Sequence, residues 1–214
     1  MLDPQVYALF VTAALVLTLT PGPDTLFVLG ASLQGGTRGG LLAAAGILTG
    51  LVVHIGLAVV GVSMLIATSP VAFDVLRVTG AVYLVWIGIG VLRRAGCHGG
   101  ADTTVTPTAR TWSRLYWQGT ATNILNPKVA VFYVAFLPQF VAPELGHAPV
   151  QLFLLGLTHW LMGVPYLVTV AVASGAVAGW LRRSPRIRRG LDAVSGLVFI
   201  GLALRLLAAR RTPA

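Results

Sequence analysis

An apolar stretch near the start of the chain is interrupted by the residues best suited to chemistry, Thr20-Pro21-Gly22-Pro23-Asp24-Thr25. Proline lacks a backbone N–H and clashes with the preceding turn, so a helix must break there. The helix that restarts after the break offers free amides and the positive end of its dipole, which suit a carboxylate. Asp24 can pair with an ammonium group, or take up a proton when that group leaves. These residues therefore predict a binding site for a zwitterion, with proton exchange at the carboxyl group.

A second break is predicted at Asn126-Pro127-Lys128, with Asn123 one turn earlier. Lys128 is the only lysine in the chain and lies within an apolar stretch. If the two breaks meet, Lys128 can come close to Asp24. The alternative interpretation is structural: a buried Asp24–Lys128 ion pair would hold the two segments together, and removal of one partner would cost about 3–5 kcal/mol.

Four side chains in other apolar stretches are weaker candidates for the same site: His54, His159, Trp160 and Tyr166. His54 follows Gly46 and Gly50 on one helical face. Small residues four apart let helices approach closely, so a packing face is the favoured interpretation of these glycines. On this interpretation Gly50→Leu lowers the amount of folded protein. Trp160 and Tyr166 either face a cavity or simply pack.

The composition is that of a membrane protein, because 56% of the residues are hydrophobic, 10% are charged and the mean hydropathy is +0.84. Soluble domains carry roughly 25% charged residues. The net charge of +9 comes from arginines at the ends of apolar runs, which indicates a role in topology and lipid contact rather than nucleic-acid binding. The single cysteine, Cys97, excludes an intrachain disulfide and lacks the further ligands of a metal site.

At about 20 residues per span, the 214 residues accommodate roughly six transmembrane helices. The fold class expected is an all-α integral membrane protein in which helices 1 and 4 are broken by proline. The spans are predicted at about residues 6–33, 41–67, 71–92, 116–141, 150–178 and 191–207.

The chain is expected to form a single transmembrane domain of residues 1–214 that contains two repeats. Repeat 1 covers about 1–93, a polar cytoplasmic loop about 94–115, and repeat 2 about 116–214. Each repeat has three spans, so the two must insert with opposite orientation, and each begins with a span that is interrupted near its middle. Interrupted segments at matching positions in two halves point to a binding site at the repeat interface.

Three features together resemble the LysE/RhtB family of bacterial amino-acid exporters, the homoserine, threonine and lysine efflux type. They are the Thr-Pro-Gly-Pro-Asp-Thr segment at 20–25, the glycine-spaced second span, and the stretch Asn-Pro-Lys-Val-Ala-Val-Phe-Tyr-Val-Ala-Phe-Leu-Pro-Gln-Phe at 126–140. The resemblance covers essentially the whole chain. It implies efflux of amino acids or their derivatives, coupled to proton entry. The family's prolines and charges carry over to Pro21, Gly22, Pro23, Asp24, Asn126, Pro127 and Lys128.

The expected function is therefore secondary active export of amino acids across the bacterial cytoplasmic membrane by a multi-pass protein; the alternative is an accessory membrane subunit that transports nothing. Neither enzymatic activity nor a cofactor or metal is expected. The expected partners are a small amino-acid substrate, protons and the lipid bilayer, without nucleic acid, and a homodimer is left open. The excess of positive charge predicts cytoplasmic loops after spans 1, 3 and 5 and both termini outside. These loops contain Arg38, Arg93, Arg94, Arg110, Arg114, Arg182, Arg183, Arg186, Arg188 and Arg189.

Overall fold

The computed structural model describes residues 4–62, 112–142 and 145–174, together with isolated positions between 64 and 93 and between 193 and 204. Outside the described residues lie half of the predicted span at 71–92, most of the predicted span at 191–207, most of the predicted loop at 94–115, and Cys97. Within the described part every regular element is helical and no strand occurs. The prediction of an all-α protein is confirmed for this part of the chain.

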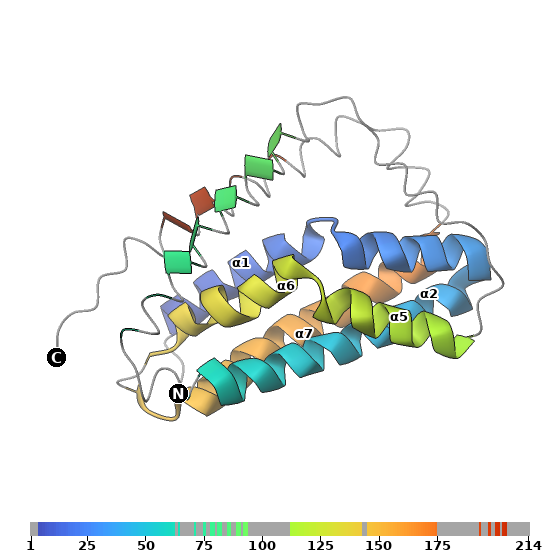
Figure 1. Cartoon of the computed structure of the whole chain (residues 1–214). Coiled ribbons are helices and arrows are strands. Elements are labelled where there is room, and N and C mark those ends of the chain that lie inside the picture. Colours follow the sequence, from blue (N-terminus) through green and yellow to red (C-terminus); the bar gives the residue numbers. More distant parts are fainter. Residues whose placement is uncertain are drawn as a thin grey trace.

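The element order is the one drawn in Figure 1. The α-helices are α1 (Pro4–Leu19), α2 (Pro23–Leu57), α5 (Trp112–Ile124), α6 (Pro127–Val131) and α7 (Ala148–Val172). The π-helices η1 (Ala58–Val62) and η2 (Phe132–Phe136) extend α2 and α6, and the 3-10 helix η3 (Leu137–Phe140) follows η2. By length and composition, Pro23–Val62 and Ala148–Val172 are long and apolar enough to cross a membrane. The structure ends α7 at Val172, before the predicted end at 178, and begins α5 at Trp112, before the predicted start at 116.

Both predicted proline breaks are present. Between α1 and α2, Gly22 is the N-cap of α2 in an extended conformation, and Pro23 takes the first helical position, where its missing N–H costs nothing. Between α5 and α6, Asn126 is the N-cap, and its side-chain oxygen accepts a hydrogen bond from the backbone N–H of Lys128 at 3.1 Å. Pro127 is the first residue of α6, so both helices begin with a proline, although only α6 has a side-chain cap.

Helix α2 is a hairpin of two arms rather than one rod, because the chain reverses at Gly36 (Figure 1). Gly36 has φ of 64° and ψ of −171°, a conformation that residues with a Cβ rarely adopt. The connection between the predicted spans at 6–33 and 41–67 is therefore a turn at a single residue. The guanidinium of Arg38 lies 5.0 Å from the ring centre of Trp112, so the turn is fixed against the start of α5 by a cation–π contact.

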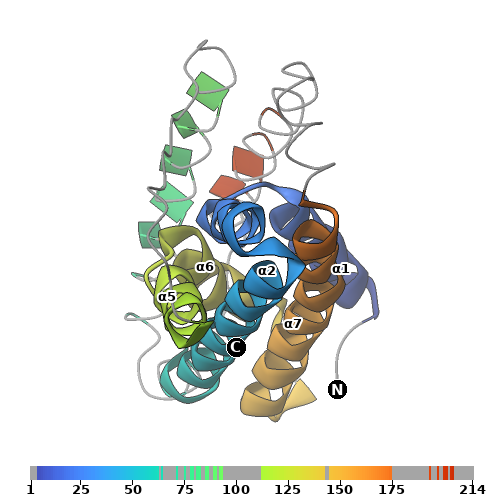
Figure 2. The same cartoon turned by 90° about the vertical axis from the view of Figure 1, so that its right-hand side faces the viewer.

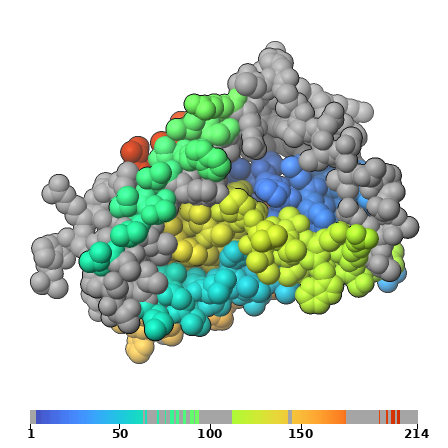
Figure 3. Space-filling view, viewed as in Figure 1, coloured from blue at the N-terminus to red at the C-terminus, as the bar shows by residue number. Residues whose placement is uncertain are grey.

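The second arm of α2 is the centre of the bundle and packs between α5 and α7 (Figure 2). Figure 3 shows this arm in cyan beside α5 and the α6–η2 segment. The contact with α5 depends on glycine: a Cβ on Gly46 would overlap the main-chain oxygen of Tyr116, and one on Gly50 would lie 2.7 Å from Asn123 Oδ1. The prediction that these two glycines form a packing face is confirmed.

Candidate functional site

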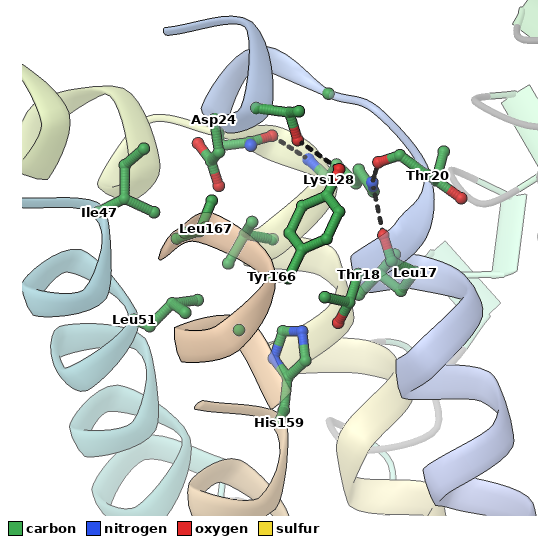
Figure 4. Close-up of a pocket in the computed structure, with 15 residues that line it drawn as sticks. Leu17, Thr18, Thr20, Asp24, Ile47, Leu51, Lys128, His159, Tyr166 and Leu167 are labelled. Carbon is green, nitrogen blue, oxygen red and sulfur yellow. Dashed lines mark hydrogen bonds between the residues drawn. The ribbon is translucent and has the colours of Figure 1, made fainter. Parts of the chain in front are cut away.

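Lys128 joins the two helix breaks directly. Its Nζ atom donates hydrogen bonds to the main-chain oxygens of Leu17 and Thr20, both at 2.9 Å (Figure 4). The last carbonyls of a helix have no partner within the helix, and the C-terminal end of the dipole favours a cation. Lys128, the second residue of α6, therefore caps the C-terminus of α1. The sequence predicted that the breaks meet, but not that this lysine binds backbone rather than a carboxylate.

The carboxylate of Asp24 is bound by Asn123. The Asn123 Nδ2 atom donates to Asp24 Oδ2 at 2.7 Å, while Asp24 Oδ1 is buried and has no hydrogen-bond partner. Asn123 is itself fully buried on α5, and its main-chain oxygen is 3.2 Å from Nε2 of His54. Asn123, predicted as a site residue, thus contacts the carboxylate of Asp24 but does not itself line the cavity.

The alternative prediction of an Asp24–Lys128 ion pair is wrong. Both side chains are described, and no ion pair joins them; Asp24 binds Asn123, whereas Lys128 binds the end of α1. The physical reason is that each charge has another polar partner: Lys128 binds carbonyls left free by the break after α1, and Asp24 binds the Asn123 side chain on α5. The two charges nevertheless line one cavity.

This cavity lies where the two breaks face α7 and the second arm of α2 (Figure 4). Its volume of about 60 Å³ leaves room for a few water molecules. The predicted site residues that line it are Gly22, Asp24, Thr25, Asn126, Lys128, His159 and Tyr166. The remaining lining residues are Leu17, Thr18, Thr20, Ile47, Leu51, Val129, Gly163 and Leu167.

Helix α7 contributes two oriented polar side chains to the cavity. The hydroxyls of Tyr166 and Thr25 are 3.1 Å apart, and Nδ1 of His159 is 3.0 Å from the hydroxyl of Tyr133. Of the two alternatives for Tyr166, the structure places its side chain at the cavity. Tyr133 was not predicted as part of the site, although it lies within the 126–140 stretch that carries the family resemblance.

The other predicted residues surround the cavity without lining it. His54 is buried and stacks on Tyr133, with ring centres 5.6 Å apart and planes at 16°. Trp160 packs, and its Nε1–H donates to the main-chain oxygen of Leu48 at 3.1 Å. Pro21, Pro23 and Pro127 shape the breaks. Among the residues that the structure describes, no three His, Cys, Asp or Glu side chains gather where they could hold a metal ion.

The chain is similar to known proteins over nearly all of its length. A family model described as "LysE type translocator" matches residues 15–210. Leucine efflux proteins of Salmonella typhimurium and of Klebsiella pneumoniae are each 33% identical over 202 residues, which is 94% of this chain and 93% of each relative. No solved structure matches the chain.

Proposed function

The chain belongs to the LysE type translocator family, and from this premise we propose that it exports neutral amino acids across the bacterial cytoplasmic membrane by proton antiport. The relatives named leucine efflux proteins support an amino acid as the exported substrate. The composition and the apolar lengths of Pro23–Val62 and Ala148–Val172 support a location in the membrane.

The observation that carries the proposal is that two opposite charges line one cavity without pairing. Lys128 has three N–H donors, of which two bind Leu17 and Thr20. Asp24 has one buried oxygen without a hydrogen-bond partner. A zwitterion satisfies both at once: its carboxylate accepts the third donor of Lys128, and its ammonium donates to Asp24 Oδ1. The positive end of the α2 dipole, at Pro23, also favours the carboxylate.

Proton coupling follows from the chemistry of Asp24. While the substrate is bound, its ammonium neutralises the carboxylate; when the substrate leaves, a proton takes its place and forms the neutral acid. If the empty site returned with a charged Asp24 carboxylate in the low-dielectric interior, the free-energy cost would be high. The empty site therefore returns with Asp24 protonated. Each cycle then moves one amino acid out and one proton in.

The experiment that tests this proposal compares Asp24→Asn, Lys128→Met and the double variant, each purified and reconstituted alone in proteoliposomes. Membrane abundance and proton-driven amino-acid flux are scored separately. Asp24→Asn keeps the shape of the side chain and removes the proton-binding group, so we expect normal abundance and flux at background. Lys128→Met removes the donor to two carbonyls of α1 and to the substrate, so both folding and flux decline.

Full proton-coupled transport by the double variant would overturn the coupling proposal. Flux by the wild-type chain alone also distinguishes an exporter from an accessory subunit, because the vesicles contain no other protein. Wild-type flux that is equal with and without a pH gradient would support export but contradict proton antiport.

A further inference from the structure

We propose that Leu51, Gly163 and Leu167 form the subsite for the substrate side chain, and that Gly163 sets the upper size of the amino acid that is exported. This inference rests on the proposed function and deepens it. None of these residues was singled out by the charges and prolines of the breaks. They come instead from the second arm of α2 and from α7.

One part of the cavity wall is lined by aliphatic side chains. Lys128 and the end of α1 lie on one side, whereas Ile47, Leu51 and Leu167 lie on the other (Figure 4). If an amino acid binds Asp24 through its ammonium and Lys128 through its carboxylate, its side chain must lie in the rest of the cavity. That space is bounded by aliphatic groups, which favour burial of an aliphatic substrate side chain.

A charged substrate side chain would find no carboxylate or ammonium group there beyond those of Asp24 and Lys128. Apart from Asp24 and Lys128, the ionisable side chains that line the cavity are His159 and Tyr166. His159 is already hydrogen-bonded to Tyr133, and Tyr166 to Thr25. Burying an unpaired charge in this site would be costly, so the aliphatic side selects neutral amino acids.

Gly163 differs from the packing glycines of the bundle. A Cβ on Gly163 would lie 3.6 Å from Leu51 Cδ1 and 3.8 Å from Leu48 Cδ2, which are ordinary contact distances. On the same helix, a Cβ on Gly156 would lie 2.9 Å from Ile55 Cγ1, too close without a shift. Helix packing therefore requires glycine at 156 but not at 163. Gly163 lines the cavity, and its missing side chain leaves space next to Leu51, which also lines it.

The small size of the cavity makes this position sensitive. At about 60 Å³, each methyl group added at Gly163 occupies a substantial share of the space available to the substrate. A pocket that differs by one methylene group changes discrimination between substrates by about 10–200-fold. Substitutions at 163 should therefore change which amino acid is exported before they change whether the protein folds.

The experiment measures competing leucine and alanine flux in proteoliposomes for the wild-type chain, Gly163→Ala, Gly163→Val and the control Gly56→Val. Gly56 is exposed, and no described atom lies within 4 Å of a Cβ placed there. We expect Gly163→Val to lower the leucine-to-alanine ratio by about 10-fold or more and to retain alanine flux. Gly163→Ala shifts the ratio in the same direction by less, and Gly56→Val leaves it unchanged.

An unchanged ratio in both Gly163 variants, at normal abundance and with wild-type flux intact, overturns this inference and leaves the proposed function standing. Equal loss of leucine and alanine flux in Gly163→Ala overturns it too. If Gly163→Val does not reach the membrane, Gly163→Ala decides, because its Cβ fits at ordinary contact distances. A wild-type chain that moves neither amino acid overturns the proposed function and this inference together.

Discussion

Asn123 is the residue on which the position of the acid depends. Its side-chain amide holds one oxygen of Asp24 at 2.7 Å, and its main-chain oxygen contacts His54. Gly50 lies against the Asn123 side chain, and a Cβ at position 50 would be 2.7 Å from Asn123 Oδ1. Glycine at 50 therefore leaves room for the asparagine, and the asparagine binds one oxygen of Asp24 while the other has no hydrogen-bond partner.

Replacing Asn123 by alanine should raise the KM for the amino acid and lower stability. The change removes the donor to Asp24 Oδ2 and leaves a buried carboxylate with both oxygens unsatisfied, at a cost of about 1–3 kcal/mol. Transport kinetics and thermal unfolding in detergent measure the two effects. Thr122→Val is the matched control on the same helix, because the Thr122 hydroxyl donates a hydrogen bond at 2.7 Å to the main-chain oxygen of Gln118, one turn earlier in that helix. A KM equal to that of the control would contradict the orienting role.

At the scale of elements, the close approach of α2 and α5 determines whether the site assembles. Asp24 lies on the first arm of α2 and Asn123 on α5, while Gly46 and Gly50 bring the second arm of α2 against α5. The glycine contact therefore fixes where Asn123 lies when it binds Asp24. Thr120 adds a hydroxyl donor to the main-chain oxygen of Gly46 at 3.0 Å across the same contact. Small residues thus bring two backbones together, and the polar contacts follow from that approach.

Gly46→Ala should markedly lower the amount of folded protein in the membrane. The added Cβ would overlap the main-chain oxygen of Tyr116, and backbone cannot move aside as a flexible side chain can. Gly56→Ala is the control, because the same change in helix propensity occurs there at an exposed position. Detergent-extracted monodisperse protein, measured by fluorescence size-exclusion chromatography, gives the comparison. Equal yields of the two variants would contradict this prediction, because they would mean that α2 and α5 can move apart without loss of folded protein.

The helix breaks could be predicted from the sequence because proline acts locally. Pro23 and Pro127 start α2 and α6, as expected from their chemistry. The partners of the charges could not be predicted, because Asp24 and Asn123 are 99 positions apart and their contact depends on how α2 packs on α5. Opposite charges suggested an ion pair, but the unsatisfied carbonyls of α1 were a partner that sequence pattern does not reveal.

The π-helices and the role of Gly163 were also missed, for a different reason. Nothing in the residues of η1 or η2 distinguishes a π-helix from an α-helix by apolar period, and the choice depends on tertiary packing. Gly163 reads as one more small residue of a membrane helix. The role proposed for Gly163 can be inferred only when the atoms around the position of its missing Cβ are known.

At the scale of the whole molecule, the two ends of the bundle should face opposite sides of the membrane. The turn at Gly36 and the connection between η3 and α7 lie at opposite ends of the described helices (Figure 1). Arg38 is at the first end, and the positive charge of the predicted loops places this end in the cytoplasm. The connection at the other end would then face outward.

This orientation predicts opposite labelling of two single-cysteine variants in a Cys97→Ser background. Thr37 and Leu145 are both exposed, one at each end. We expect a membrane-impermeant maleimide added to intact cells to label Leu145→Cys, and to label Thr37→Cys only after the membrane is opened. Labelling of Thr37→Cys in intact cells, with Leu145→Cys protected, would reverse the orientation.

Because α2 reverses at Gly36, its two arms are joined without a flexible loop between them. One residue makes the turn, and immediately beyond it Gly39 lies so close that a Cβ there would be 2.7 Å from the main-chain oxygen of Ala31. We therefore expect the two arms to move together as one rigid unit. Within the described helices, we therefore expect the two unwound stretches beside the cavity to be the segments that bend during a transport cycle, so that the segments proposed to bind the substrate would also be those that move.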